Sequence, residues 1–222
     1  SSSCLVCVDS CGEALLPCMM VSDKRAVEES AFLEKAPEFK DVKEKTELGM
    51  MPSLMMPKAL WVKRHKSEIF DKISKFLSPN DYLIAKFTGC YVTDYLNATK
   101  WHYDVDKKQY PVALLKKIGI QENMLPKVVP PGACVGTLLR SAAEQTGLTE
   151  DTRIITATYD AICSFIGSGA LEEGEASDVS GTVTVFRAAV RQKTKRITDR
   201  IQKIPYYESG IQIIGGSNNL GG

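Results

Sequence analysis

In the last third of the chain, some apolar stretches have the spacing of strands and others have the spacing of a helix. Residues 153–158 form a short segment that is rich in β-branched side chains, which is typical of a strand. Residues 161–170 carry small and apolar side chains at helical spacing, with glycines near the end, and predict a helix. Asp160 lies between the two. Two further strands are predicted after the helix, at residues 175–180 and 183–190.

The first two thirds of the chain predict short strands and amphipathic helices. Residues 1–8 and 14–20 indicate two strands that form a hairpin. Residues 57–65 begin a helix, and residues 68–77 continue its amphipathic pattern. The other elements expected are helices at 26–33, 80–87, 111–118 and 141–147, strands at 90–93 and 211–214, and a loop with a strand over 125–138.

Composition and charge are those of an ordinary soluble globular protein. Of the 222 residues, 44% are hydrophobic and 25% are charged, so the chain is long and apolar enough to bury a sizeable core. The formal net charge is +1, and we therefore expect neither a nucleic-acid partner nor attraction to a membrane surface. No apolar run approaches the length of a membrane span, and residues 4–8 are too few for a signal peptide.

Cysteine usage favours core packing over a metal site. Cys4 and Cys7 have the spacing of half a zinc site, but no second pair lies at a typical distance. The residues around them alternate as in a strand buried on both faces, where Cys behaves as a small hydrophobic residue. We expect no metal ligands. The odd count of seven cysteines, with no secretion signal, indicates a reducing, cytoplasmic location.

A lone carboxylate before a helix, followed by a glycine turn, is compatible with phosphoryl transfer to a hydroxyl group. Asp160 would accept the proton of the attacking hydroxyl as general base. Backbone N–H groups near Gly181 and the Thr182 hydroxyl would hold phosphate oxygens, because glycine allows a close approach. The alternative is structural: an Asp before a helix is commonly an N-cap, and Gly-Thr between strands is commonly a hairpin turn. Spacing alone favours the structural alternative at both places.

The run from Asp160 to Thr182 also resembles the FGGY family of carbohydrate kinases. That family has an acid before a helix of small residues that ends in Gly-x-Gly, then E-G-x-A, then a strand that ends in Gly-Thr. The counterparts here are Asp160, AICSFIGSG, Glu173-Gly174-Glu175-Ala176 and Ser180-Gly181-Thr182. The resemblance implies that Asp160 is the catalytic base and that Gly181 and Thr182 contact the transferred phosphate. Tyr159 and Val183 depart from the residues usual in the family.

Earlier segments carry the same resemblance. The run VSDKRA is similar to the family's W-x-D-x-R-A, and TDYLNAT is similar to T-D-x-x-N-A-S/T. The segments PKALWVKRH and SPNDYLIAKFTG follow the family's signature between them. The resemblance implies that Asp23, Arg25, Asp94 and Tyr95 lie beside the sugar. Without it, Asp23 would be an N-cap, Arg25 a solvated charge and Asp94 part of a turn.

What the resemblance implies for the fold is an α/β chain of the actin-like, ribonuclease H-like type, with substrate and ATP between two domains. Residues 1–180 would be the sugar-binding N-terminal domain without its first phosphate loop, and residues 181–222 the beginning of the nucleotide-binding domain. The cofactors implied are ATP and Mg²⁺. The chain would then be the central part of a longer kinase, and we expect it to be inactive and poorly stable alone.

Three functional hypotheses follow. The leading one is a kinase that transfers the ATP γ-phosphoryl group to a hydroxyl of a sugar, a ketose such as a pentulose, or of a polyol. The alternative is a non-catalytic sugar-binding or regulatory relative, which the departures at Tyr159 and Val183 favour. The third is an α/β domain whose turns have only structural roles. The partners expected are a small-molecule sugar and ATP, and a homodimer is left open.

Overall fold

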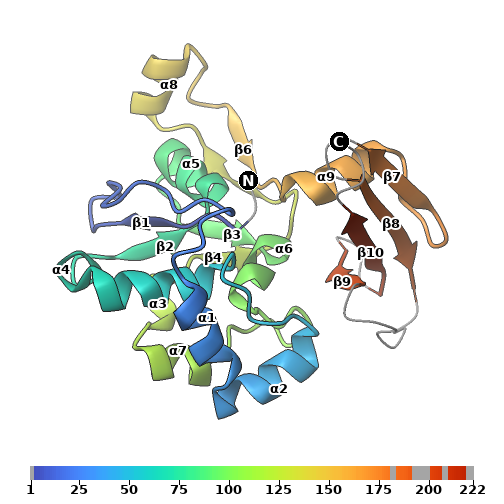
Figure 1. Ribbon diagram of the computed structural model, residues 1–222. Coiled ribbons are helices and arrows are strands. Elements are labelled where there is room, and N and C mark those ends of the chain that lie inside the picture. The colour runs from blue at the N-terminus through green and yellow to red at the C-terminus, as the bar shows by residue number, and fades with distance from the viewer. Residues whose placement is uncertain (1–2, 181–183, 192–200, 207–209, 219–222) are drawn as a thin grey trace. The chain divides into compact units, whose positions relative to one another are not determined.

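The computed structural model of the protein describes residues 3–180, 184–191, 201–206 and 210–218. The chain divides into two compact units, Ser1–Ala157 and Thr158–Gly222, which Figure 1 shows in blue to yellow and in orange to red. The domain boundary predicted after residue 180 separates the sugar-binding and nucleotide-binding domains of the family. The division into compact units does not test it, and it stays a prediction. No helix within the described part of the chain combines the length and apolar character that a membrane crossing needs.

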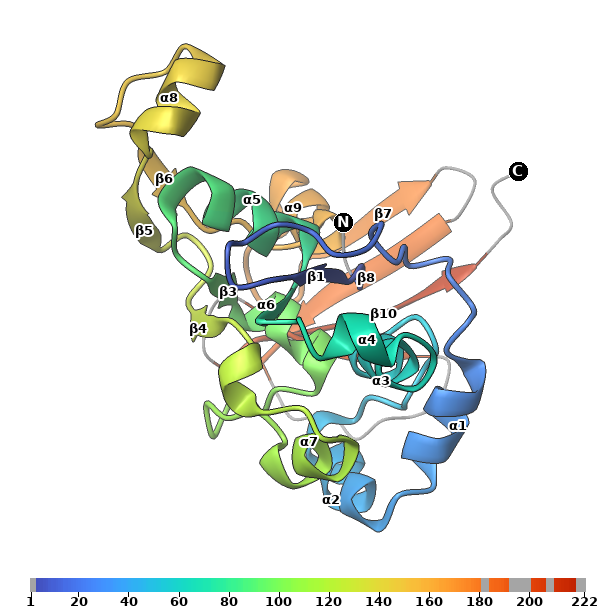
Figure 2. The same ribbon diagram turned by 90° about the vertical axis from the view of Figure 1, so that its left-hand side faces the viewer.

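The first unit is mainly helical. The helix α3 (Met55–His65) confirms the one predicted at 57–65, and α5 (Pro79–Thr88) and α7 (Val112–Ile118) confirm those at 80–87 and 111–118. The unit extends from α8 at one end to α2 and α7 at the other (Figure 2). Its other helical elements are α1 (Val27–Glu34), α2 (Pro37–Thr46), α4 (Ser67–Phe70), α6 (Tyr95–Ala98), η1 (Thr99–Trp101), η2 (Glu122–Met124) and α8 (Arg140–Thr146).

The strands of the first unit form separate pairs. β1 (Val6–Val8) pairs antiparallel with β2 (Lys75–Leu77), β3 (Val92–Asp94) pairs parallel with β4 (Lys127–Val129), and β5 (Cys134–Thr137) pairs antiparallel with β6 (Arg153–Ile155).

The predicted hairpin partner at residues 14–20 is not a strand. It makes two isolated bridges to the first strand, Leu5 with Met19 and Val8 with Ala14. Pro17 lies between these bridges and has no backbone N–H to continue the ladder.

The amphipathic pattern predicted through residues 68–77 is wrong in its second half. Helix α4 ends at Phe70, and Lys75–Leu77 form β2 instead. Phe76 and Leu77 are fully buried, and both lie opposite residues of β1. Lys75–Leu77 pair with β1, which lies nearly seventy positions earlier in the chain, and this pairing overrides the local helical spacing. The sequence contains no local signal for that pairing.

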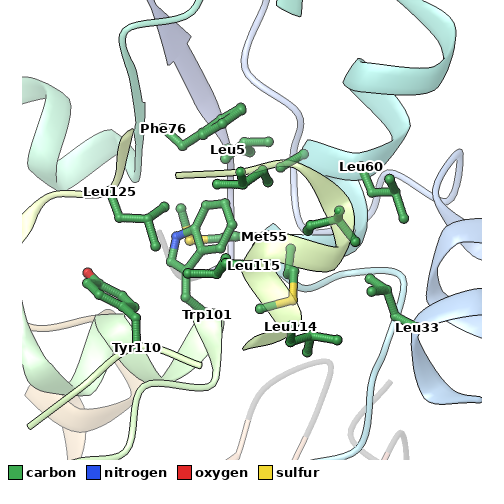
Figure 3. Packing of buried hydrophobic residues seen from close by; sticks show 14 of the residues in the cluster. Leu5, Leu33, Met55, Leu60, Phe76, Trp101, Tyr110, Leu114, Leu115 and Leu125 are labelled. Atoms are coloured by element: carbon green, nitrogen blue, oxygen red, sulfur yellow. The ribbon is translucent and has the colours of Figure 1, made fainter. Parts of the chain in front are cut away.

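The core of the first unit surrounds Trp101, which is 1% exposed. Side chains from β1, α1, α3, β2 and α7 form one cluster with it, and Figure 3 shows Leu33, Met55, Phe76 and Leu114 among them, together with Leu5 just before β1. Met50, Met55 and Met56 are also buried in this cluster, where unbranched side chains fill irregular space. Cys4 and Cys7 are buried too, as expected for small hydrophobic residues.

The described residues of the second unit form one helix, α9 (Asp160–Gly167), and an antiparallel sheet of strand order β7-β8-β10-β9 (Figure 1). On α9, Phe165 packs edge-to-face against Tyr206, whose hydroxyl donates to the Ala170 carbonyl at 3.2 Å. The predicted strands at 175–180 and 183–190 are confirmed, whereas β9 was not predicted. The elements are α9 (Asp160–Gly167), β7 (Ala176–Ser180), β8 (Thr184–Val190), β9 (Gln202–Pro205) and β10 (Gln212–Asn218).

Candidate functional site

Asp23 and Arg25 lie together on the turn that leads into α1. The Arg25 Nε is 3.0 Å from both carboxylate oxygens of Asp23, and the Arg25 backbone N–H donates to Asp23 Oδ1 at 3.0 Å. These hydrogen bonds with Arg25 lower the pKa of Asp23. The Arg25 guanidinium also lies 4.4 Å from the ring centre of Trp61, within the range of a cation–π contact. Asp23 is therefore a fixed anion beside a fixed cation, with Arg25 half-exposed at the surface.

A small cavity of about 100 Å³ adjoins this charge pair. Its wall is largely apolar, and Arg25 supplies a charged edge to it. A hollow of this size holds a few water molecules or part of a small ligand. Its lining consists of Leu16, Pro17, Cys18, Met19, Arg25, Trp61 and Lys66.

Asp94 is buried, and its carboxylate is hydrogen-bonded to the start of the helix that follows it. It is 1% exposed and forms the N-cap of α6 at the end of β3. Its Oδ1 accepts from the backbone N–H groups of Leu96 at 2.9 Å and Asn97 at 3.2 Å, and its Oδ2 accepts from the Asn97 side-chain amide at 2.7 Å. These bonds satisfy donors that the start of a helix leaves unpaired. The carboxylate therefore orders the turn from which Tyr95 projects.

Tyr95 is the first residue of α6 and packs against the edge of the core. Burial raises the pKa of its hydroxyl, and the negative charge of Asp94 raises it further. The hydroxyl thus stays protonated at neutral pH and can take part in hydrogen bonding as a donor.

Asp160 is exposed and is the first residue of α9. The N-cap position belongs to Tyr159, which makes no side-chain cap hydrogen bond. Asp160 Oδ1 accepts from the N–H of the next residue, Ala161, at 2.9 Å. The helix starts one residue earlier than the sequence predicts, so Asp160 is not the N-cap of the structural alternative. A carboxylate in this first turn is favoured by the helix dipole and presents its charge to solvent.

Gly181 and Thr182 lie outside the described residues, as does Val183. The strands on either side of them, β7 and β8, pair antiparallel with Ser180 opposite Thr184. Their predicted contact with phosphate stays a prediction.

The predicted residues fall into both compact units. Asp23 and Arg25 are in direct contact in the first unit, and Asp94 with Tyr95 marks a second place in that unit. Asp160 belongs to the second unit. Within the ranges that the structure describes, no group of three or more His, Cys, Asp or Glu side chains could hold a metal ion.

No role was predicted for Lys58 and Trp61, which contact the turn of Asp23 and Arg25 from α3. Both lie in the run PKALWVKRH, and that run was the available signal. Which atoms they contact depends on residues almost forty positions earlier, such as Met20.

Comparison with known proteins places this geometry in a family. Residues 2–167 match the N-terminal domain of the FGGY family of carbohydrate kinases. The chain is 30% identical to the xylulose kinase of Bacillus subtilis (strain 168) over 178 residues, which are 77% of this chain and 36% of that protein. It is 31% identical to the autoinducer-2 kinase of Klebsiella pneumoniae subsp. pneumoniae over 181 residues, which are 80% of this chain and 34% of that protein.

Solved structures agree. The ligand-bound xylulose kinase from Lactobacillus acidophilus superposes on the whole of this chain with a TM-score of 0.88 at 24% identity, and the chain covers 45% of that structure. This likeness confirms the predicted α/β fold class of the actin-like, ribonuclease H-like sugar kinases. The chain spans about a third of the length of the curated relatives named above. The family match covers residues 2–167, well over half of the chain, and the chain therefore belongs to the FGGY family of carbohydrate kinases.

Proposed function

We propose that the protein carrying this chain is an ATP-dependent kinase that phosphorylates a hydroxyl of a sugar or polyol. The observation that carries the proposal is the exposed carboxylate of Asp160 at the first position of α9, in a chain of the FGGY family. A carboxylate that is not consumed as a helix cap is available to accept a proton.

In the proposed reaction, Asp160 takes the proton of the attacking hydroxyl as that oxygen bonds to the γ-phosphorus of ATP. The bond from this phosphorus to the β,γ-bridging oxygen breaks, and ADP leaves. Gly181 and Thr182 would hold phosphate oxygens through a backbone N–H and a hydroxyl. Mg²⁺ bound to the ATP oxygens would neutralise the charge that develops on them. Asp23 and Arg25 would bind sugar hydroxyls, and Asp94 would act through the position of Tyr95.

The substrate proposed is a ketose. Relatives of this chain are named xylulose kinase, autoinducer-2 kinase and L-fuculokinase, and a solved glycerol kinase shares the fold. A reducing cytoplasm, where ATP and sugars are available, is the proposed location, and a homodimer is the assembly to test. The non-catalytic alternative predicts sugar binding without turnover.

The test uses the longest natural protein that contains this chain. ADP release from ATP is followed by a coupled assay with D-xylulose, L-fuculose, D-gluconate and glycerol, each with Mg²⁺ and with excess EDTA. We expect release with at least one ketose and its loss with EDTA. Sugar-induced thermal stabilisation without ADP release for any compound would support the non-catalytic alternative. No stabilisation and no release would leave only a structural role.

A further inference from the structure

Lys58 on α3 is a fully buried lysine, with 0% of its surface exposed. Lysine is almost never buried completely unless its ammonium group has partners. Here the partners are backbone carbonyls: Nζ donates to Ser3 and to Met20 at 2.7 Å each, and to Met19 at 3.4 Å. Burial lowers the pKa of Lys58. An apolar side chain would fill the same space without this desolvation, so the hydrogen bonds to the carbonyls are what the ammonium group adds.

The Met20 carbonyl connects Lys58 to the candidate sugar-binding pair. This oxygen also accepts from the backbone N–H of Asp23 at 3.0 Å, which closes the turn before α1. Asp23 in turn receives the backbone and side-chain N–H groups of Arg25. An unbroken series of hydrogen bonds therefore runs from the buried ammonium group, through one carbonyl oxygen, to the charge pair.

Helix α3 makes a second contact with the same turn, through the ring of Trp61 and the guanidinium of Arg25. Trp61 follows Lys58 by three residues, so the two side chains lie on neighbouring parts of the helix surface. Trp61 supports the guanidinium of Arg25 at 4.4 Å, while Lys58 holds the backbone before Asp23. Two residues of one rigid helix thus determine where both charges of the pair lie.

The hydrogen bonds of Lys58 to Ser3 and Met20 form a clamp between two segments of the chain, and Ser3, on the side away from Asp23, also has a constrained backbone. Its φ is 60°, in the left-handed region that residues other than glycine seldom adopt. In this conformation its carbonyl accepts from Lys58 at 2.7 Å. The ammonium group therefore joins the segment before β1 to the turn before α1.

We propose that Lys58 is a positioning residue, which holds the Met20–Asp23 turn so that Asp23 and Arg25 meet the sugar in a fixed geometry. This rests on the proposed function, because it takes the charge pair as part of the sugar site. Lys58 does not touch the substrate. It acts through the Met20 carbonyl, and its loss should weaken sugar binding more than it slows the chemical step.

The first experiment compares Lys58→Met with Lys63→Met in the longest natural protein that contains this chain. Lys63 is the matched control, because it lies on the same helix and donates to a backbone carbonyl, that of Ile118, at 2.7 Å, but contacts a different part of the unit. With D-xylulose as the probe, we expect Lys58→Met to raise KM for the sugar about tenfold, with kcat and KM for ATP changed less than about threefold. Lys63→Met should leave all three constants near those of the parent protein.

The second readout does not need activity. Hydrogen exchange at the Asp23 amide, which donates to the Met20 carbonyl, should be about tenfold faster in Lys58→Met, because the turn is then no longer held to α3 through that carbonyl and opens more often. The Lys66 amide at the end of α3 donates to Val62 at 2.8 Å and should exchange as in the parent protein. If no sugar is phosphorylated, the proposed function fails, and faster exchange confined to the turn still supports the clamp.

The proposal has clear contrary outcomes. Unchanged KM together with unchanged exchange at Asp23 would overturn it. A general loss of protection across α3, or equal effects of Lys58→Met and Lys63→Met on KM, would reduce Lys58 to a structural residue. If Lys58→Met does not fold, Lys58→Gln keeps an amide NH2 that can donate to the carbonyls, and it should show the same KM effect in weaker form. Failure of both variants to fold would also overturn the positioning role.

Discussion

Asp94 and Asp160 both lie where a helix follows a strand in the sequence, and the structure uses them in opposite ways. Asp94 is the N-cap of α6, is 1% exposed, and accepts hydrogen bonds from two backbone N–H groups and one side-chain amide. Asp160 is one position further on, the first residue of α9, and is exposed. A shift of one residue relative to the helix start separates a structural carboxylate from an available one.

A third acid extends the comparison. Asp81 is at the third position of α5, where it forms a capping box with Ser78: the Ser78 N–H donates to Asp81 Oδ2 at 2.8 Å, and the Asp81 N–H donates to Ser78 Oγ at 3.2 Å. Asp81 is 3% exposed. Of these three acids, Asp94 at the N-cap and Asp81 at the third position are buried and have structural roles, and Asp160 at the first position faces solvent. This contrast supports the assignment of proton transfer to Asp160.

The largest expected effect comes from Asp160→Asn in the longest natural protein that contains this chain. The amide keeps the size of the side chain but cannot accept the proton, so kcat with the best sugar should fall about 10²–10⁴-fold. KM for the sugar should change little, and the free energy of unfolding should change by less than about 0.5 kcal/mol, because the side chain is exposed. Asp151→Asn, at another exposed acid, is the control and should have normal kinetics. Near-normal turnover of Asp160→Asn would end its assignment as the base.

The same substitution at Asp94 should lower the stability of the fold, whereas Asp160→Asn should lower kcat with little change in stability. Asp94→Asn places an amide against the Asn97 side-chain amide and weakens the cap, at a cost of about 1–3 kcal/mol in the free energy of unfolding. Urea unfolding of the longest natural protein that contains this chain, followed by hydrogen exchange of amides in the first unit, measures this. Equal stability of the Asp94→Asn and parent proteins would show that the cap has no net value.

The fold was largely predictable where its signals are local. The helices at Met55–His65 and Val112–Ile118 follow from apolar spacing, and β7 and β8 were predicted as two strands joined at Gly181-Thr182. β2 was missed because Phe76 and Leu77 continue the helical spacing of the residues before them, and only pairing with β1 makes them a strand. Local patterns do not carry information about a partner that distant.

The candidate site was less predictable for a related reason. The sequence predicted that Asp160 precedes a helix but did not distinguish the N-cap from the first helical residue, a difference smaller than the usual uncertainty of a helix boundary. Asp94 was predicted in a turn, and helix α6 after it was not predicted. Lys58 gave no sign of burial, because a lysine on an amphipathic helix reads as solvated. Its carbonyl partners at Ser3 and Met20 come from segments that only the folded chain brings to α3.

The last expected effect is a dependence of stability on pH that belongs to Asp81. Burial raises the pKa of Asp81 to about 7, and the charge of Asp94 adds to the shift. Below about pH 4 the residue is protonated in both the folded and the unfolded chain. As the pH rises from about 4 to about 7, the unfolded chain releases this proton while the folded chain keeps it. Asp81 therefore lowers the free energy of unfolding by at most about 1.4 kcal/mol per pH unit over this window.

Asp81→Asn removes this slope, because the amide does not titrate while its oxygen still accepts from the Ser78 N–H. The difference in unfolding free energy between Asp81→Asn and the parent chain should therefore move in favour of the variant as the pH rises from about 4.5 to about 6.5. His102 has a pKa lowered by burial to about 3, which gives a slope of opposite sign, but it is present in both proteins and cancels in the difference. Asp94→Asn should reduce the Asp81 slope without abolishing it, since burial is the larger cause. Parallel curves for Asp81→Asn and the parent chain would mean that Asp81 is ionised in the fold. The hydrogen bond from the Ser78 N–H would then outweigh burial in setting the charge of Asp81.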